Sequence, residues 1–99
     1  HLFPYTTLFR SIKHLKSIHP YPTEEYCCPI CNRDIKELSR TGQKMLQSWV
    51  LDHCHDTETF RAWVCFNCNT GLGAFKDSLE RITKAKIYLE DHIQKQKEK

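Results

Sequence analysis

The chain has 99 residues and a mass of 11.8 kDa, with 39% hydrophobic and 27% charged residues and a formal net charge of +3. This length fits one domain and excludes a second. No run approaches the ~18 consecutive apolar residues of a membrane span, and the first residues lack the pattern of a secretory signal, so we expect a cytoplasmic protein.

The amino-terminal residues stand apart from the rest of the chain. Residues 2–11, LFPYTTLFRS, resemble the in-frame translation of a sequencing-adapter oligonucleotide. We therefore expect a non-native leader over residues 1–11 and a single domain over residues 12–99, with its core in residues 27–93. Apolar residues at near-helical spacing predict a short helix over residues 11–18, which Pro20 and Pro22 end.

Six cysteines offer a staple for a chain whose own core must be small. Without a secretory signal the thiols should stay reduced, which favours a metal over disulfides. Four of the six cysteines form two C-x2-C pairs. A zinc ion bound by all four of their thiolates has no open position for water, so it should be structural. Cys27 and Cys54 are expected to stay outside this site. The alternative is that the four cysteines of this site are buried free or disulfide-bonded cysteines. The pattern C-x2-C-x33-C-x2-C, which predicts one such zinc per chain, is formed by Cys28, Cys31, Cys65 and Cys68.

The middle of the chain predicts a loop followed by a hairpin. Polar residues 36–46 are typical of a loop, and residues 47–64 predict a β-hairpin around the polar connection 56–59. Residues 65–68 are then expected to turn the chain. Successive side chains of a strand point to opposite faces. If this alternation persists to the end of the first strand, one face carries Trp49, Leu51, His53 and His55, and the other carries Val50, Asp52 and Cys54.

The last segment predicts a helix over residues 78–93, with residues 77–80 as a capping box and a fraying polar end. We expect the hairpin and the zinc-binding turns to cover its apolar stripe, which leaves a monomer or a weak homodimer. The stripe consists of Leu79, Ile82, the stem of Lys86, Leu89 and Ile93.

Charge is distributed unevenly along the chain. Residues 10–44 carry seven basic and four acidic groups (+3), residues 45–75 one and three (−2), and residues 76–99 seven and five (+2). An acidic middle between basic flanks suits a metal site on a surface that meets phosphate. An ordinary solvated surface explains the charge equally well.

A second polar cluster, Asp52-His53-Cys54-His55, lies at the end of the first predicted strand. An adjacent imidazole and carboxylate can supply a general base and a hard-metal ligand to one phosphate. The alternatives are packed or solvated histidines, or an H-x-H pair that binds a transition metal. Asn69 directly follows Cys68, and zinc closure of the two thiol turns would bring it toward the base of the hairpin. There its carbonyl oxygen could complete a Mg²⁺ site with Asp52.

These residues match a known family. CPIC at residues 28–31, LDHCHDTETFRAWVCFNCNTGLGAF at residues 51–75 and the helix LERITKAKIYLE resemble the recombination endonuclease VII family of His-Me finger (ββα-metal, HNH-like) nucleases. The resemblance implies a small α+β, zinc-stapled ββα-metal domain with a C-terminal helix. It also implies a DNA endonuclease in a bacterial or phage-infected cell, with branched DNA as a candidate substrate.

Roles carry over residue by residue from this resemblance. The two C-x2-C pairs look like the zinc ligands, and Asp52 and Asn69 like the ligands of a catalytic Mg²⁺ or Mn²⁺. His53 looks like the general base that takes a proton from the attacking water, and His55 like a second histidine that positions or polarises the phosphate. The family usually has an acidic residue where Cys54 stands and a glycine where Ala62 stands.

Basic side chains are candidates for contacts to DNA phosphates: Arg61, Arg33, Lys36, Arg40 and Lys44. For most of them a solvated surface charge is the alternative. A different class of function is a non-catalytic zinc module that binds nucleic acid or protein. A third hypothesis is a zinc hydrolase with His53 and His55 as ligands, and it would require a second zinc ion besides the one at the four cysteines.

Overall fold

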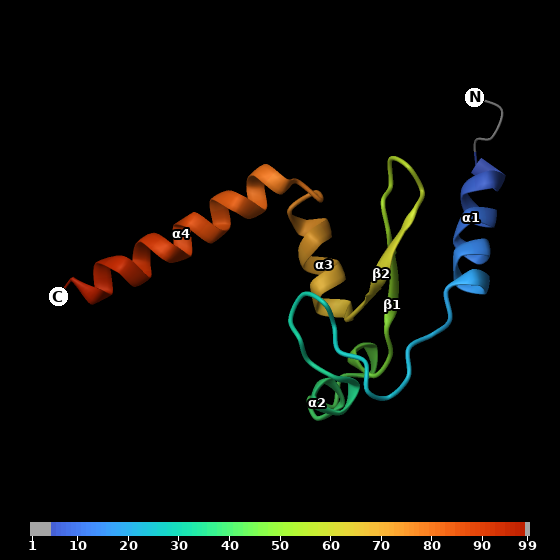
Figure 1. Cartoon of the computed structure of the whole chain (residues 1–99), viewed down its shortest axis with the longest axis horizontal. Helices are drawn as coiled ribbons and strands as arrows, with labels where there is room; N and C mark the ends of the chain where they lie inside the picture. The colour runs from blue at the N-terminus through green and yellow to red at the C-terminus, as the bar shows by residue number, and fades with distance from the viewer. Residues whose placement is uncertain (1–4, 99) are drawn as a thin grey trace. The chain divides into compact units, whose positions relative to one another are not determined.

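The computed structural model describes the backbone of residues 5–98 and the side chains of residues 12–98. Residues up to Asn69 belong to one compact unit, and those from Thr70 onward belong to a second. Within residues 5–98, no helix combines the length and the apolar character that a membrane crossing requires. In chain order (Figure 1) the elements are α1 (Tyr5–Ile18), α2 (Ile35–Ser39), the 3-10 turn η1 (Lys44–Leu46), β1 (Val50–His53), β2 (Phe60–Val64), α3 (Phe66–Ala74) and α4 (Leu79–Lys97).

The predicted β-hairpin is confirmed, because β1 and β2 pair antiparallel. Cys54 N–H donates to the Thr59 carbonyl at 2.8 Å, and Glu58 N–H donates to the Cys54 carbonyl at 2.7 Å. Glu58 takes a left-handed φ of 58°, which lets this short connection close. The hairpin therefore holds the end of β1, where the candidate histidines begin, in a fixed place.

A bulge interrupts the hairpin next to Asp52. Asp52 lies opposite Ala62 and His53 lies opposite Phe60, so Arg61 is an extra residue on β2. Such a bulge re-aims a side chain that regular alternation would send to the other face. The extra residue is on β2 and not on β1, the strand for which alternation was predicted.

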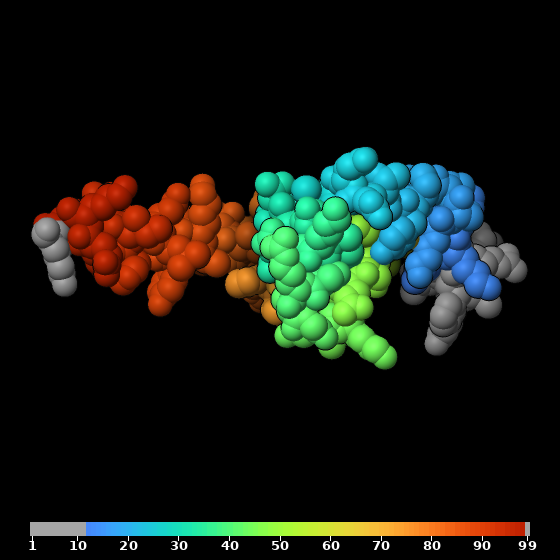
Figure 2. Space-filling view, turned by 90° about the horizontal axis from the view of Figure 1, so that it is seen from below, coloured from blue at the N-terminus to red at the C-terminus, as the bar shows by residue number. Residues whose placement is uncertain are grey.

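The core lies where the hairpin meets the segment before it. Residues 20–46, cyan to green in Figure 2, lie in front of the strands in that view. Tyr21 reaches across this boundary, and its hydroxyl accepts from Trp49 N–H at 2.8 Å. The buried apolar side chains that the structure describes are Leu15, Cys28, Leu38, Leu46, Trp49, Leu51, Trp63, Val64 and Cys65.

Residues 36–46 do not form the expected loop, because they contain α2 and η1. Asp34 caps α2 by accepting from Glu37 N–H at 2.8 Å. Leu38 and Leu46 are 0% and 1% exposed, so each short turn is anchored by one leucine in the core. Two isolated leucines carry too little periodicity to predict these turns from the sequence.

The helix expected over residues 11–18 ends at Ile18, as predicted, but its backbone begins at Tyr5. Part of the expected leader is thus helical, while residues 1–4 lie outside the described range. Leu15 of this helix is buried in the core. The expected turn over residues 65–68 is also wrong as stated, since α3 begins at Phe66 directly after β2. Gly71 and Gly73 weaken the helical signal there.

The carboxy-terminal helix exists but differs in two ways from the expectation. Its cap is Ser78, which accepts from Arg81 N–H at 3.1 Å, and not Asp77 of the expected capping box. α4 also continues to Lys97, through the tail that was expected to fray. No residue of α4 is buried, and Leu79 is 79% exposed. That the hairpin and the zinc-binding turns cover its apolar stripe stays a prediction.

The small core makes each anchor costly to remove. We expect Leu46→Ala to lower the free energy of unfolding by about 2–5 kcal/mol, because it deletes a buried side chain and leaves a cavity. Met45→Ala is the matched control, since Met45 is 52% exposed one residue away. Urea denaturation of the metal-loaded protein measures both. Equal losses for the two variants would contradict the assignment of Leu46 to the core.

Candidate functional site

Four thiols meet at one point of the structure. The Sγ atoms of Cys28, Cys31, Cys65 and Cys68 all lie within 4.8 Å of one another. The Sγ atoms of Cys31 and Cys65 are 3.7 Å apart. Zinc bound tetrahedrally at ≈ 2.3 Å from each sulfur would hold neighbouring sulfurs about 3.8 Å apart, whereas a disulfide needs about 2.05 Å. The cluster therefore fits a four-thiolate metal ion and not a pair of disulfides.

Backbone hydrogen bonds shape both thiol turns. Cys28 N–H donates to the Arg33 carbonyl at 2.9 Å, and Asn32 N–H donates to the Cys28 carbonyl at 2.8 Å. Asn32 has a left-handed φ of 61°, which an asparagine tolerates better than most residues. In the other turn, Cys68 N–H donates to Cys65 Sγ at 3.4 Å. Each turn thus places its two sulfurs on one side before any metal arrives.

The remaining two cysteines lie outside the cluster, in agreement with the expectation. Cys27 is exposed, although its backbone forms a β-bridge with Asp34. Cys54 stands at the start of the hairpin connection, where hydrogen bonds from the Thr57 side chain and backbone lower the pKa of its thiol. Cys28 and not its neighbour Cys27 therefore completes the set of four.

Arg33 is a counter-charge to the thiol cluster that the sequence analysis did not anticipate. Its Nε donates to Cys31 Sγ at 3.3 Å. Burial would raise the pKa of the Cys31 thiol, but hydrogen bonds from Arg33 outweigh that effect and lower the pKa to about 6. Burial raises the pKa of the Cys65 and Cys68 thiols. One thiolate is thus formed in advance, and two thiols hold their protons until a metal binds.

Metal binding should therefore release protons. At pH 7.5 we expect zinc to displace at least two protons, from Cys65 and Cys68, and none from Cys31, because that thiol is already ionised. The affinity should fall as the pH falls, and Cys31 should add to the loss only below about pH 6. Calorimetry in buffers of different ionisation enthalpy counts the protons. Arg33→Gln should release about one more proton than the parent. Arg40→Gln should not, and equal counts for all three proteins would contradict the role of Arg33.

Loss of one thiol should unfold the chain. We expect Cys65→Ser to lose the metal and its cooperative unfolding transition, because a structural zinc contributes about 10–16 kcal/mol and small domains have about 5–15 kcal/mol in total. Cys27→Ser should keep both, since Cys27 lies outside the cluster. Elemental analysis and circular dichroism measure the two properties. A folded, metal-free Cys65→Ser protein would refute a metal staple.

Asp52 is a buried carboxylate with a cationic partner. It lies in β1, and its residue is 7% exposed. Arg61 donates from Nε to Asp52 Oδ2 at 2.7 Å and from Nη2 to Oδ1 at 3.0 Å. A buried carboxylate requires a cation, and the planar guanidinium satisfies both oxygens. An oxygen ligand of this kind suits Mg²⁺, which could take the place of part of this pair.

The two candidate histidines lie close together at the end of β1. Their ring centroids are 4.8 Å apart, with planes tilted by 53°. His53 is half-buried at the last position of the strand, whereas His55 is exposed in the connection. The structure therefore brings His53 and His55 together directly after the buried Asp52, with one ring sheltered and one facing solvent.

Asn69 lies one turn into α3 and is half-buried. Its N–H donates to the Cys65 carbonyl at 3.0 Å, so its backbone is tied to the thiol cluster. Among residues 12–98, the four thiols form the only group of three or more His, Cys, Asp or Glu ligand atoms.

The basic candidates fall into two groups. Arg61 and Arg33 are engaged with Asp52 and Cys31, as described above. Lys36, Arg40 and Lys44 are exposed on α2, on the turn after it and at the start of η1. Solvent, and hence a phosphate backbone, can reach these three side chains, and the side chain of Arg61 is 37% exposed as well.

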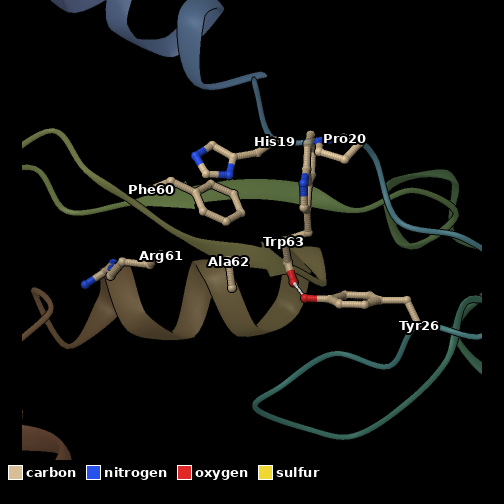
Figure 3. Close-up of a pocket in the computed structure, with 7 residues that line it drawn as sticks. All are labelled: His19, Pro20, Tyr26, Phe60, Arg61, Ala62 and Trp63. Carbon is tan, nitrogen blue, oxygen red and sulfur yellow. Dashed lines mark hydrogen bonds between the residues drawn. The ribbon is translucent and has the colours of Figure 1, made fainter. Parts of the chain in front are cut away.

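An aromatic pocket of ≈ 350 Å³ lies beside the site and was not predicted from the sequence. The His19 ring stacks on Phe60 with centroids 3.8 Å apart, and the Tyr26 hydroxyl donates to the Trp63 carbonyl at 2.6 Å. These contacts attach the end of α1 and the approach to the thiol turn to β2. Its lining residues (Figure 3) are His19, Pro20, Tyr26, Phe60, Arg61, Ala62 and Trp63.

Comparison with known proteins identifies the family. The family model for recombination endonuclease VII matches residues 8–91. This chain belongs to the recombination endonuclease VII family. No curated protein matches it. Among solved structures, the crystal structure of the beta-beta-alpha-Me type II restriction endonuclease Hpy99I matches with 34% identity and a TM-score of 0.60.

The match to Hpy99I covers 84% of this chain but 41% of the Hpy99I chain. The family and this neighbour support a nuclease and confirm the expected fold class, a small α+β domain close to the ββα-Me fold. The run β1, β2 and α3 has the matching order of elements. The expected resemblance is thus confirmed at the level of family and fold.

Proposed function

We propose that this protein is a Mg²⁺-dependent DNA endonuclease that hydrolyses phosphodiester bonds, with branched DNA as a candidate substrate. The observation that carries the proposal is the arrangement at the end of β1, where paired His53 and His55 rings follow a buried Asp52 in a member of a nuclease family. A base, a second imidazole and an anionic ligand are the groups that hydrolysis of a phosphodiester requires.

Each side chain has a separate task in this proposal. His53 accepts the proton of the attacking water through its imidazole. His55, exposed beside it, donates a hydrogen bond to the phosphate and orients it for attack. Asp52 and Asn69 would hold a Mg²⁺ or Mn²⁺ ion, which when bound stabilises negative charge on the phosphate and the leaving oxygen.

We assign the four-thiol cluster to one structural zinc ion per chain. Four thiolates complete the tetrahedral shell, so no position is left for water or substrate. Its task is to hold the thiol turn before α2 against the start of α3, from which Asn69 projects. The roles of the two metals are therefore separate.

DNA would be held through its backbone. Lys36, Arg40 and Lys44 are exposed and can contact phosphates without reading base sequence. Each chain carries one set of site residues, so we propose a monomer or weak homodimer that nicks one strand per encounter. A cytoplasmic location in a bacterial or phage-infected cell agrees with a site that relies on reduced thiols.

The function is tested on supercoiled plasmid and on a four-way junction, each with Mg²⁺ and with EDTA. We expect Mg²⁺-dependent conversion of supercoiled plasmid to open circle before linear product appears, with 5′-phosphate and 3′-hydroxyl ends. Binding of either DNA without cleavage under all conditions would favour the alternative, a non-catalytic zinc module. Paired cuts across the junction by a stable dimer would refute nicking by single chains.

The general base has its own test. We expect His53→Ala to lower the cleavage rate about 10²–10⁴-fold, because it removes the proton acceptor, while zinc content and DNA binding stay unchanged. His92→Ala is the control, since His92 is exposed on α4. Initial nicking rates, elemental analysis and an electrophoretic shift assay measure the three properties. Parent-level cleavage by the His53→Ala protein would reject this base.

A further inference from the structure

The pair between Arg61 and Asp52 is more than a surface ion pair. The guanidinium engages both carboxylate oxygens, at 2.7 and 3.0 Å, and the Asp52 side chain is 8% exposed. In regular pairing, Arg61 would face away from Ala62, the residue opposite Asp52. The bulge on β2 instead places Arg61 within reach of Asp52. This end of the hairpin is thus built to join these two side chains.

The same carboxylate oxygens are those that a divalent cation would need. A fork of two parallel N–H···O bonds occupies the lone pairs that point outward from a carboxylate. A metal ion bound by Asp52 would compete with the guanidinium for the same two oxygens and their negative charge. Resting on the function proposed above, we propose that Arg61 is an exchangeable counter-ion of Asp52: the divalent metal displaces it, and the released N–H groups bind a DNA phosphate.

Burial and exposure favour such an exchange. A carboxylate as buried as Asp52 needs a cation at all times, and exchange of one cation for another keeps it compensated. The Arg61 side chain is 37% exposed, so its guanidinium can turn toward solvent. Figure 3 shows this guanidinium pointing away from His19, Phe60 and Trp63. A guanidinium that leaves a carboxylate can form the same two parallel N–H···O bonds with two oxygens of a phosphate.

The exchange couples two binding events. Without metal, Arg61 is held by Asp52 and contributes little to DNA binding. With metal, it becomes a phosphate ligand, so metal and DNA each strengthen the binding of the other. The contrasting model is a permanent pair, in which Arg61 only holds Asp52 in the right rotamer. The two models predict opposite effects of removing Arg61 on metal affinity.

Metal affinity is measured first, without DNA, on the zinc-loaded full chain. Mn²⁺ is the probe, and the electron paramagnetic resonance signal of the aquo ion reports the unbound fraction. We expect Arg61→Gln to bind Mn²⁺ about tenfold more tightly than the parent, because a competing cation is gone. Arg61→Lys, which keeps the charge but lacks the fork, should lie between them. Arg81→Gln on α4 is the matched control and should bind as the parent does.

DNA binding is measured next, in a His53→Ala background that cannot cleave. Loss of one phosphate contact lowers the slope of log K against log salt by about 0.9. We expect Arg61→Gln to lower the slope by that amount with Mn²⁺ present and to leave it unchanged with EDTA. Fluorescence anisotropy on a labelled duplex supplies the slopes. Arg81→Gln should change neither value.

Each outcome decides the proposal. Unchanged or weaker Mn²⁺ binding by a folded Arg61→Gln protein would overturn it in favour of the permanent pair. Equal salt slopes with and without Mn²⁺ would overturn the release of Arg61. If Arg61→Gln does not fold, Arg61→Lys gives the same decision. Asp52→Asn separates the two proposals: if it binds Mn²⁺ as the parent does, the proposed metal site itself is wrong, and the exchange falls with it.

Discussion

The convergence of four sulfurs is the constraint on which the amino-terminal unit depends. The buried apolar side chains are few, and two of them, Cys28 and Cys65, are themselves members of the thiol cluster. The 3.7 Å separation of the Cys31 and Cys65 sulfurs spans 33 intervening residues and joins the turn before α2 to the junction of β2 and α3. Closing so long a loop costs conformational entropy that this core alone is poorly able to offset. The metal ion proposed for the four thiolates would supply that energy at one point.

Several features could be predicted from the sequence because they are local. The spacing C-x2-C is a property of one turn, and it identified all four members of the cluster and left out Cys27 and Cys54. Strand alternation around a polar connection identified the hairpin, and Ser78 identified the start of α4. In each case the residues that decide the structure are within a few positions of one another, so no knowledge of distant contacts was needed.

Other features depend on distant partners, and the sequence could not reveal them. α2 and η1 form because Leu38 and Leu46 find a core whose other walls come from the hairpin and α1. α3 forms despite two glycines, directly after a strand whose end is fixed by Cys65. The candidate site shows the same division. The motif predicted that Asp52, His53 and His55 would be neighbours, but the bulge that gives Asp52 an arginine partner depends on the pairing register of two strands.

β2 links the staple to the candidate active site. Arg61 stands near one end of this strand and Val64 at the other, next to Cys65, so the two centres are separated by about 10–13 Å of extended chain. That distance keeps the thiolate charge away from the candidate phosphate position, while the paired strand holds the two centres at a fixed separation.

The thiol cluster also orients Asn69, because the backbone N–H of Asn69 donates to the Cys65 carbonyl at the start of α3. One staple thus fixes two of the candidate site's supports, the pairing of β2 with Asp52 and the first turn of α3. Arg61 lies near the far end of that strand, where its side chain is 37% exposed while its backbone belongs to the paired hairpin.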